Sequence, residues 1–145
     1  MHFDHNICLM RSSKHLYEIE LAVRDYELDL QGIVNNSVYQ NYFEHARHEY
    51  LYSRNIDFAG LHAEGKDLIV HRIEIDYKHS LQSHDRFRVT VDVEREGHLK
   101  IVFVQSIYRV PDDKLIAKAR VYGACLLQGK PVKPETILDP KQLGL

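Results

Sequence analysis

NNSVYQNYFEHARHEYLYSR, residues 35–54, is the stretch of sequence that decides the fold. Its apolar residues recur at steps of three and four, which is the spacing of one helical face. The members of this stripe are Tyr39, Tyr42, Phe43, Ala46 and Tyr50. Ser37, with Gln40 three positions later, has the form of a capping box, so the helix is expected to begin near Asn36 or Ser37 and to run to about Arg54.

Alternating apolar and polar residues on both sides of this helix predict strands. One strand precedes the helix, at Leu16–Arg24. The others follow it, at Leu68–Lys78, Arg86–Arg95, Leu99–Arg109 and Leu115–Leu127. In the first of these, Ile69, His71, Ile73, Ile75 and Tyr77 are expected to share one face. A strand, a long helix and a strand meander indicate an α+β fold with the helix on one face of an antiparallel sheet.

The length of 145 residues and the absence of a linker predict one domain, with its core at about residues 16–127. The tail 129–145 contains Pro131, Pro134 and Pro140. Proline has no backbone N–H to donate, so this tail is expected to be a surface extension that does not continue the sheet.

Composition and charge exclude several classes of protein. The 19 Lys and Arg residues against 21 Asp and Glu leave a net charge of -2, which does not favour nucleic-acid binding. No apolar run approaches the roughly 20 residues that a membrane-spanning helix needs. Met1–Arg11 lacks the layout of a secretory signal, so we expect a cytoplasmic protein. Cys8 and Cys125 are expected to be unrelated, reduced thiols.

The chemically dense segment is RDYELDLQGIVNNS, residues 24–37, just before the helix. It carries Asp25, Glu27 and Asp29 at alternate positions, followed by Gly32. A loop that opens into a helix N-terminus presents unpaired amides, which can stabilise an oxyanion, and a nearby carboxylate can act as a base or nucleophile. Composition alone favours the simpler interpretation that these acidic residues are solvated.

The pattern Asp-x-x-Gly-Ile-Val-Asn-Asn-x-x-Tyr-x-x-Tyr-Phe-Glu-x-Ala-Arg, residues 29–47, resembles the signature of the hot-dog acyl-CoA thioesterases of the 4-hydroxybenzoyl-CoA thioesterase type. The resemblance continues through Ile73–Tyr77 and Asp85–Val89. It implies an antiparallel sheet of five to six strands wrapped around one long helix. It also implies a homodimer or homotetramer with the active site at a subunit interface, and hydrolysis of an acyl-CoA or acyl-carrier-protein thioester without a further cofactor.

The same resemblance assigns roles to single residues. Asp29 takes the place of the catalytic carboxylate, as general base or as nucleophile, and the backbone amide of Asn36 would polarise the thioester carbonyl. Gly32 and Ser37 complete the expected oxyanion and substrate-binding set, whereas Asp25 and Glu27 are expected to be structural. The sequence departs from many relatives at two positions, which hold Ile33 instead of histidine and Ser80 instead of proline.

Other sites are weaker candidates. Glu44 and His48 share a helix face, but no third ligand accompanies them, so no metal site is expected. Ser37 lacks the Gly-x-Ser-x-Gly context of a nucleophile. His71 and Arg72 are candidates for contact with coenzyme A, although a histidine on an apolar stripe is more often a core or interface residue, and an exposed arginine more often only solvates.

Two alternative functions remain compatible with this fold. A hot-dog hydratase or dehydratase would pair an acidic residue with a histidine, and Ile33 counts against it. A non-catalytic acyl-CoA-binding protein would have no need for Asp29 together with Gly32. The sequence does not identify the acyl group, nor does it separate coenzyme A from acyl-carrier protein.

Overall fold

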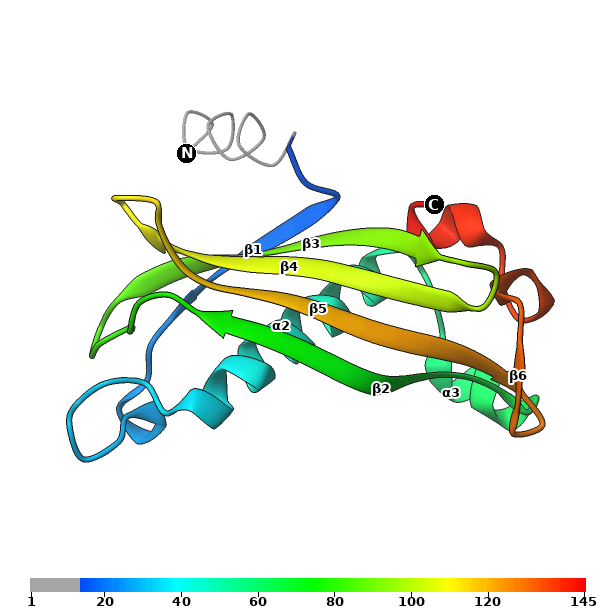
Figure 1. Cartoon of the computed structure of the whole chain (residues 1–145), viewed down its shortest axis with the longest axis horizontal. Coiled ribbons are helices and arrows are strands. Elements are labelled where there is room, and N and C mark those ends of the chain that lie inside the picture. Colours follow the sequence, from blue (N-terminus) through cyan, green and yellow to red (C-terminus); the bar gives the residue numbers. More distant parts are fainter. Residues whose placement is uncertain (1–13) are drawn as a thin grey trace.

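The computed structural model describes residues 14–145, in which a curved sheet lies against a long helix (Figure 1). The strands are β1 (Tyr17–Ala22), β2 (Lys66–Tyr77), β3 (Arg86–Glu96), β4 (Lys100–Val110), β5 (Lys114–Leu127) and β6 (Lys130–Val132). Their order is β1-β3-β4-β5-β2, with β6 paired to β5, and every pair is antiparallel. This arrangement confirms the predicted α+β hot-dog architecture.

The long helix, α2 (Asn36–Ser53), buries the aromatic stripe predicted from its sequence. Phe43, Ala46 and Tyr50 are at most 1% exposed and pack in one core with inward-facing residues of β3, β4 and β5. The predicted start is confirmed, but the capping box is wrong. The cap is Asn35, whose side chain accepts a hydrogen bond from Ser37 N, because asparagine in the extended region can reach the amide two residues on.

Three short segments and a second helix complete the chain. Helix α3 (Phe58–Ala63) follows α2 and precedes β2. The 3-10 turns are η1 (Asp25–Glu27), η2 (Pro134–Thr136) and η3 (Pro140–Leu143). Within residues 14–145, no helix has both the length and the apolar character that crossing a membrane requires.

Strand β2 contains a bulge that the regular alternation in its sequence did not predict. Leu68 and Ile75 both pack against the core, although the odd separation between them would place them on opposite faces of a regular strand. The register shifts between Val70 and Arg72, so His71 is the extra residue. His71 and Ile69 therefore do not share a regular face with Ile75, which corrects the expected stripe.

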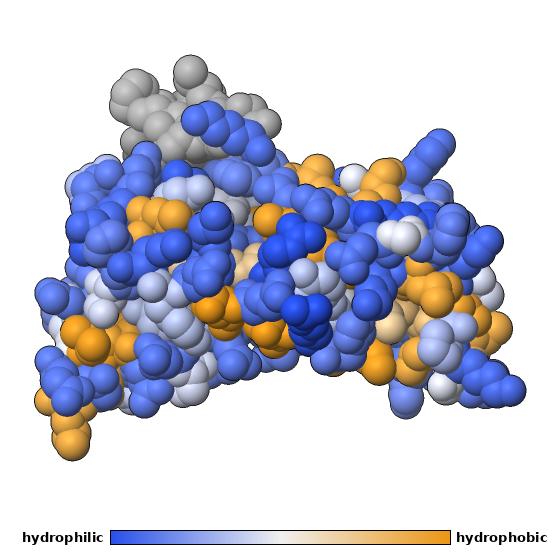
Figure 2. All heavy atoms as spheres, viewed as in Figure 1, coloured by the Kyte–Doolittle hydropathy of each residue, from blue (hydrophilic) through white to orange (hydrophobic). Residues whose placement is uncertain are grey.

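The edge formed by β2 is unusually apolar for a surface that faces water. β2 pairs only with β5, and its other edge is open among the described residues. Ile69, Val70, Ile73 and Tyr77 along this edge are 38–45% exposed. The sheet face turned away from α2 is mostly hydrophilic, interrupted by apolar patches (Figure 2). An open strand edge with exposed apolar residues is a surface that proteins normally cover.

The C-terminal tail is more than a surface extension. Strand β6 continues the sheet as a short edge segment, with Pro131 opposite Leu126. Ile137 and Leu143 are 4% and 0% exposed in the core. The expectation from the prolines was therefore wrong, because an edge strand tolerates a missing N–H donor and the following turns carry apolar residues back under the sheet.

Two expectations concern residues outside the described range: that Met1–Arg11 is not a secretory signal, and that Cys8 is a reduced thiol. Cys125 is described and is fully buried in the core. Burial raises the pKa of its thiol to about 11, which keeps it protonated near neutral pH.

Candidate active site

The loop that carries Asp29 folds as a miniature hairpin ahead of α2. Leu28 and Val34 form an antiparallel bridge, and Asp29 N donates to Ile33 O across 2.8 Å. Gly32 closes the turn by donating its amide to Asp29 O at 3.0 Å. Its φ of 80° is the left-handed conformation, and a β-carbon at this position would have nothing within 4 Å. Glycine is thus needed for its backbone angle and not for a close approach.

One oxygen of the Asp29 carboxylate is held by the loop backbone. Oδ1 accepts hydrogen bonds from Gln31 N at 2.9 Å and from Ile33 N at 3.3 Å. Oδ2 makes no hydrogen bond to any residue within 14–145, and the side chain is only partly buried. The two amides fix the direction of the carboxylate and leave its second oxygen available to a ligand or a water molecule.

The N-terminus of α2 leaves one amide without a partner. Asn35 Oδ1 accepts from both Ser37 N and Ser37 Oγ at 3.0 Å, and Val38 N donates to Asn35 O. Asn36 N has no acceptor among residues 14–145. This amide lies at the positive end of the helix dipole, where a developing negative charge is stabilised. The hydroxyl of Ser37 donates to an amide oxygen, which is too weak a base to activate it as a nucleophile.

The end of β2 contacts this loop through Tyr77, which the sequence had placed in an apolar stripe and in the family resemblance but not among the site residues. Tyr77 Oη donates to Asn36 O at 3.3 Å, and the Tyr77 ring stands edge-on to Tyr39 with centroids 5.5 Å apart. Ile33 forms a further bridge with Gln82, just after β2. The hairpin, the start of the helix and the end of β2 therefore form one connected unit. The position of Tyr77 depends on the bulge, which pattern alone does not reveal.

Asp25 and Glu27 differ clearly from Asp29 in their surroundings. Glu27 Oε1 accepts from Tyr42 Oη at 2.7 Å and from Arg24 N at 2.8 Å, so it links η1 to the helix. Burial, reinforced by Glu27, raises the pKa of Tyr42 well above its usual range, which keeps this link intact. Asp25 is exposed, with Ser83 Oγ 3.5 Å away. Asp29 has one oxygen held by backbone amides and one free oxygen, in the same loop–helix unit as Asn36 N. Neither Asp25 nor Glu27 has this combination.

His71 and Arg72 do not lie with Asp29 in the folded chain. Arg72 projects from the outer face of the sheet, where it forms an ion pair with Glu74 at 2.6 Å. Its guanidinium also lies 5.1 Å from the centre of the Tyr122 ring. His71 is the exposed bulge residue at the open edge. Contact of these two residues with coenzyme A stays a prediction.

A cavity of about 490 Å³ lies between the C-terminal half of α2 and the start of β2. Its apolar lining comes from Leu51, Phe58, Leu68, Val70 and Phe103. The charged residues Glu44, Arg47 and His48 also border it. Glu44 and His48 were the weak metal candidates, and no group of three or more His, Cys, Asp or Glu side chains within residues 14–145 is arranged to hold a metal ion.

Comparison with known proteins agrees with the fold described above. The family model for the thioesterase-like superfamily matches residues 23–137. The chloroplastic acyl-acyl carrier protein thioesterase ATL3 of Arabidopsis thaliana is 34% identical over 110 residues, or 76% of this chain. Acyl-CoA thioesterase YbgC of Haemophilus influenzae is 30% identical over 118 residues, which cover 81% of this chain and 83% of YbgC.

The chain spans little more than half the length of its plant relatives, since the matched segment covers 58% of ATL3 and 55% of the related Arabidopsis ATL2. Among solved structures, a thioesterase from Thermus thermophilus in complex with coenzyme A and Zn superposes with a TM-score of 0.75 at 25% identity, covering 89% of this chain and 92% of that one. Since the family match spans most of the chain and the fold agrees, the protein belongs to the thioesterase-like superfamily of hot-dog proteins.

Proposed function

We propose that the protein hydrolyses the thioester bond of an acyl-CoA, releasing a carboxylic acid and coenzyme A. The observation that carries this proposal is the Asp29 carboxylate, which has one oxygen fixed by two amides and the other free, in the same loop–helix unit as the unpartnered amide of Asn36. A carboxylate and an oxyanion donor are the two groups that acyl transfer requires.

The reaction follows from these two groups. The carbonyl oxygen of the thioester accepts a hydrogen bond from Asn36 N, which stabilises the negative charge that develops as the carbonyl is attacked. Asp29 either removes a proton from the attacking water or attacks the carbonyl itself to form an anhydride, which water then hydrolyses. In both cases the carbon–sulfur bond breaks and the sulfur leaves as the thiolate of coenzyme A.

The proposal includes a homodimer formed through β2. Antiparallel pairing of two β2 edges about a two-fold axis would cover Ile69, Val70 and Ile73 and would satisfy the open backbone groups. In such a pair, the end of one strand lies beside the start of the other. Tyr77, which is bonded to Asn36, would then approach Leu68 of the cavity in the second copy. Each catalytic loop would thus lie beside the cavity of its neighbour.

The proposed site would accept a thioester on either of two thiol carriers. The relatives include an acyl-CoA thioesterase and an acyl-acyl carrier protein thioesterase. Both substrates present the same phosphopantetheine thioester to a catalytic site, so the carboxylate and the amide would serve either one. Coenzyme A and acyl-carrier protein differ only in the group to which the phosphopantetheine is attached.

A direct assay distinguishes these alternatives. Purified full-length protein is incubated with aliphatic and aromatic acyl-CoA thioesters and with matched acyl-carrier-protein thioesters, and the free thiol is measured. We expect release of thiol from at least one acyl-CoA, and loss of that release in Asp29→Asn. A protein that binds acyl-CoA without releasing thiol would be a binding protein, and formation of a hydroxyacyl product without thiol release would indicate a hydratase.

A further inference from the structure

Arg47 is a buried cation without a counter-ion. It projects from the middle of α2 toward the sheet and is only 6% exposed. No carboxylate within residues 14–145 lies within ion-pair distance of its guanidinium. Desolvation lowers its pKa, an effect that the nearby Glu44 opposes. Because a buried charge is costly unless it is paired, such an arginine suggests a partner that is absent from the free chain.

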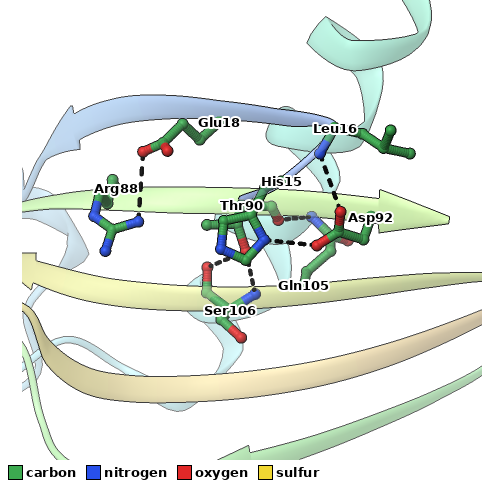
Figure 3. A network of polar contacts seen from close by, with 8 residues as sticks. All are labelled: His15, Leu16, Glu18, Arg88, Thr90, Asp92, Gln105 and Ser106. Atoms are coloured by element: carbon green, nitrogen blue, oxygen red, sulfur yellow. Dashed lines mark hydrogen bonds and ion pairs between the residues drawn. The ribbon is translucent and has the colours of Figure 1, made fainter. Parts of the chain in front are cut away.

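Within residues 14–145, the one group that binds this guanidinium is itself held in a fixed orientation. Gln105 Oε1 accepts from Arg47 Nη1 at 3.1 Å. Gln105 Nε2 donates in the other direction, to Phe43 O at 3.0 Å. It also donates to Thr90 O at 3.5 Å (Figure 3). The amide of Gln105 therefore cannot turn without losing these bonds, and it presents only its oxygen to the arginine. Arg47 and Gln105 therefore form a polar pair whose orientation is held by hydrogen bonds.

Arg47 borders the cavity described above. A guanidinium carries five N–H groups, and only Nη1 has a bonded partner among the described residues. Nε of Arg88 is fully buried and has no hydrogen-bond partner among the described residues. No nitrogen of Arg47 is in that state. The unused donors therefore retain accessible surface next to an apolar wall that includes Leu51, Phe58 and Phe103. The combination suits a ligand with an apolar body and an accepting oxygen.

We propose that this cavity receives the acyl part of the substrate, and that Arg47 and Gln105 select acyl groups that carry an accepting oxygen at their far end. A carboxylate would be preferred to a hydroxyl, since it can accept two parallel N–H bonds from the guanidinium. Glu44 also borders the cavity, but it is exposed and outside ion-pair distance, so it weakens the attraction of an anion without cancelling it.

This inference rests on the proposed function and on the pairing of two β2 edges. Within one chain, Asn36 and Arg47 are separated by about 16 Å along the helix, from the rise of 1.5 Å per residue. Across the proposed edge, the loop of one copy lies beside the cavity of the other. A thioester bound at Asn36 of one copy would direct its acyl group into that cavity, with the carboxyl or hydroxyl end at Arg47.

The test compares acyl groups that differ only at the far end. The substrates are decanoyl-CoA, ω-hydroxydecanoyl-CoA and the CoA monothioester of decanedioic acid, with the same sets built on hexanoate and dodecanoate. We expect kcat/KM for the best oxygen-bearing member to exceed that of its plain counterpart by about 10- to 100-fold, because the site would otherwise leave donors unpaired. Arg47→Met should remove this ratio, whereas Arg54→Met, at the C-cap of the same helix and outside the cavity, should retain it.

A binding measurement accompanies the kinetics, with decanoate and decanol displacing an apolar fluorescent probe from the full-length protein. Decanoate should bind more tightly than decanol in the wild type, and no more tightly in Arg47→Met. If Arg47→Met fails to fold, Arg47→Lys replaces it, because lysine retains the charge but not the paired N–H groups of the guanidinium. Arg47→Lys should reduce both the kcat/KM ratio and the preference for decanoate over decanol.

The outcomes separate the two proposals. Equal kcat/KM for plain and oxygen-bearing acyl groups at every chain length would overturn the selection by Arg47 and leave the hydrolase intact. Release of thiol from no substrate would overturn the proposed function, and the binding comparison would then decide the chemistry of the cavity. Equal binding of decanoate and decanol to the wild type would overturn the cavity assignment as well.

Discussion

Tyr77 Oη donates a hydrogen bond to the backbone oxygen of Asn36 across 3.3 Å, which ties the exposed end of β2 to the first residue of α2. The helix start carries the free amide, and β2 carries the open edge. One side chain therefore connects the open edge with the proposed oxyanion site. The Asp29 loop is attached to the same unit by the bridge between Ile33 and Gln82.

Loss of this hydroxyl should affect turnover more than folding. Tyr77→Phe keeps the ring against Tyr39 and removes one partly exposed hydrogen bond, so the thermal midpoint should change little. We expect kcat to fall several-fold, up to about 10-fold, because the helix start is less firmly placed. Steady-state kinetics and thermal unfolding check this, and an unchanged kcat would show that the bond does not position the site.

Asp29→Asn should nearly abolish turnover in a folded protein. The amide keeps the shape and can still accept from Gln31 N and Ile33 N, but it supplies neither a base nor a nucleophile. We expect kcat to fall by about 10²-fold or more. The matched control is Asp25→Asn, in the same segment and exposed, which should retain wild-type kcat. If Asp29→Asn hydrolyses the best substrate within a few-fold of wild type, the assignment is wrong.

Gly32→Val should lower both stability and turnover. The φ of 80° disfavours any residue with a β-carbon, so the loop must relax and the helix start moves relative to Asp29. A displacement of about 1 Å can cost on the order of 10²-fold in rate. Gly97→Val is the control, since Gly97 also has a positive φ of 63° and open space, but lies in the turn between β3 and β4.

Both glycine variants should lose stability, and only Gly32→Val should lose kcat once activity is corrected for the folded fraction. Thermal unfolding together with kcat distinguishes the two effects. A normal kcat in the folded fraction of Gly32→Val would mean that the left-handed turn does not set the catalytic geometry.

Ile73→Lys should prevent dimer formation and activity together. Ile73 is 38% exposed on the open edge, and a lysine there would place a charge where the second strand is proposed to pair. Light scattering of the wild type at low micromolar concentration should give at least twice the mass of 17.0 kDa, and the variant should approach 17.0 kDa. Leu99→Lys, 44% exposed in the β3–β4 turn, should remain dimeric. A monomeric wild type would contradict the interface.

Leu143→Ala should destabilise the whole domain. Leu143 is fully buried, and its backbone oxygen accepts from Tyr50 Oη at 2.6 Å, so the tail is anchored in the core. Truncation of a buried leucine costs about 2–5 kcal/mol of unfolding free energy. Leu145→Ala, two residues later and 36% exposed, should change it by less than about 0.5 kcal/mol. Urea unfolding measures both, and equal values would show that the tail contributes nothing to the core.

The sequence by itself determined the long helix, the five main strands and the candidate catalytic loop. Periodicity is a local property, so the stripe from Tyr39 to Tyr50 and the alternation in Arg86–Arg95 were sufficient to predict the helix, the strands and the α+β class. The segment around Asp29 was found by its motif, because the turn at Gly32 and the cap at the helix start are formed by neighbours in the chain.

Only the tertiary structure decided the features that depend on distant residues. The bulge at His71 lies in the pairing of β2 with β5, which the local alternation does not encode, and it removes Ile69 and His71 from the regular face that carries Ile75. The burial of Leu143 depends on space left beneath the sheet. The pairing of Arg47 with Gln105 joins residues 58 positions apart, and the isolation of this cation appears only once the chain has folded around it.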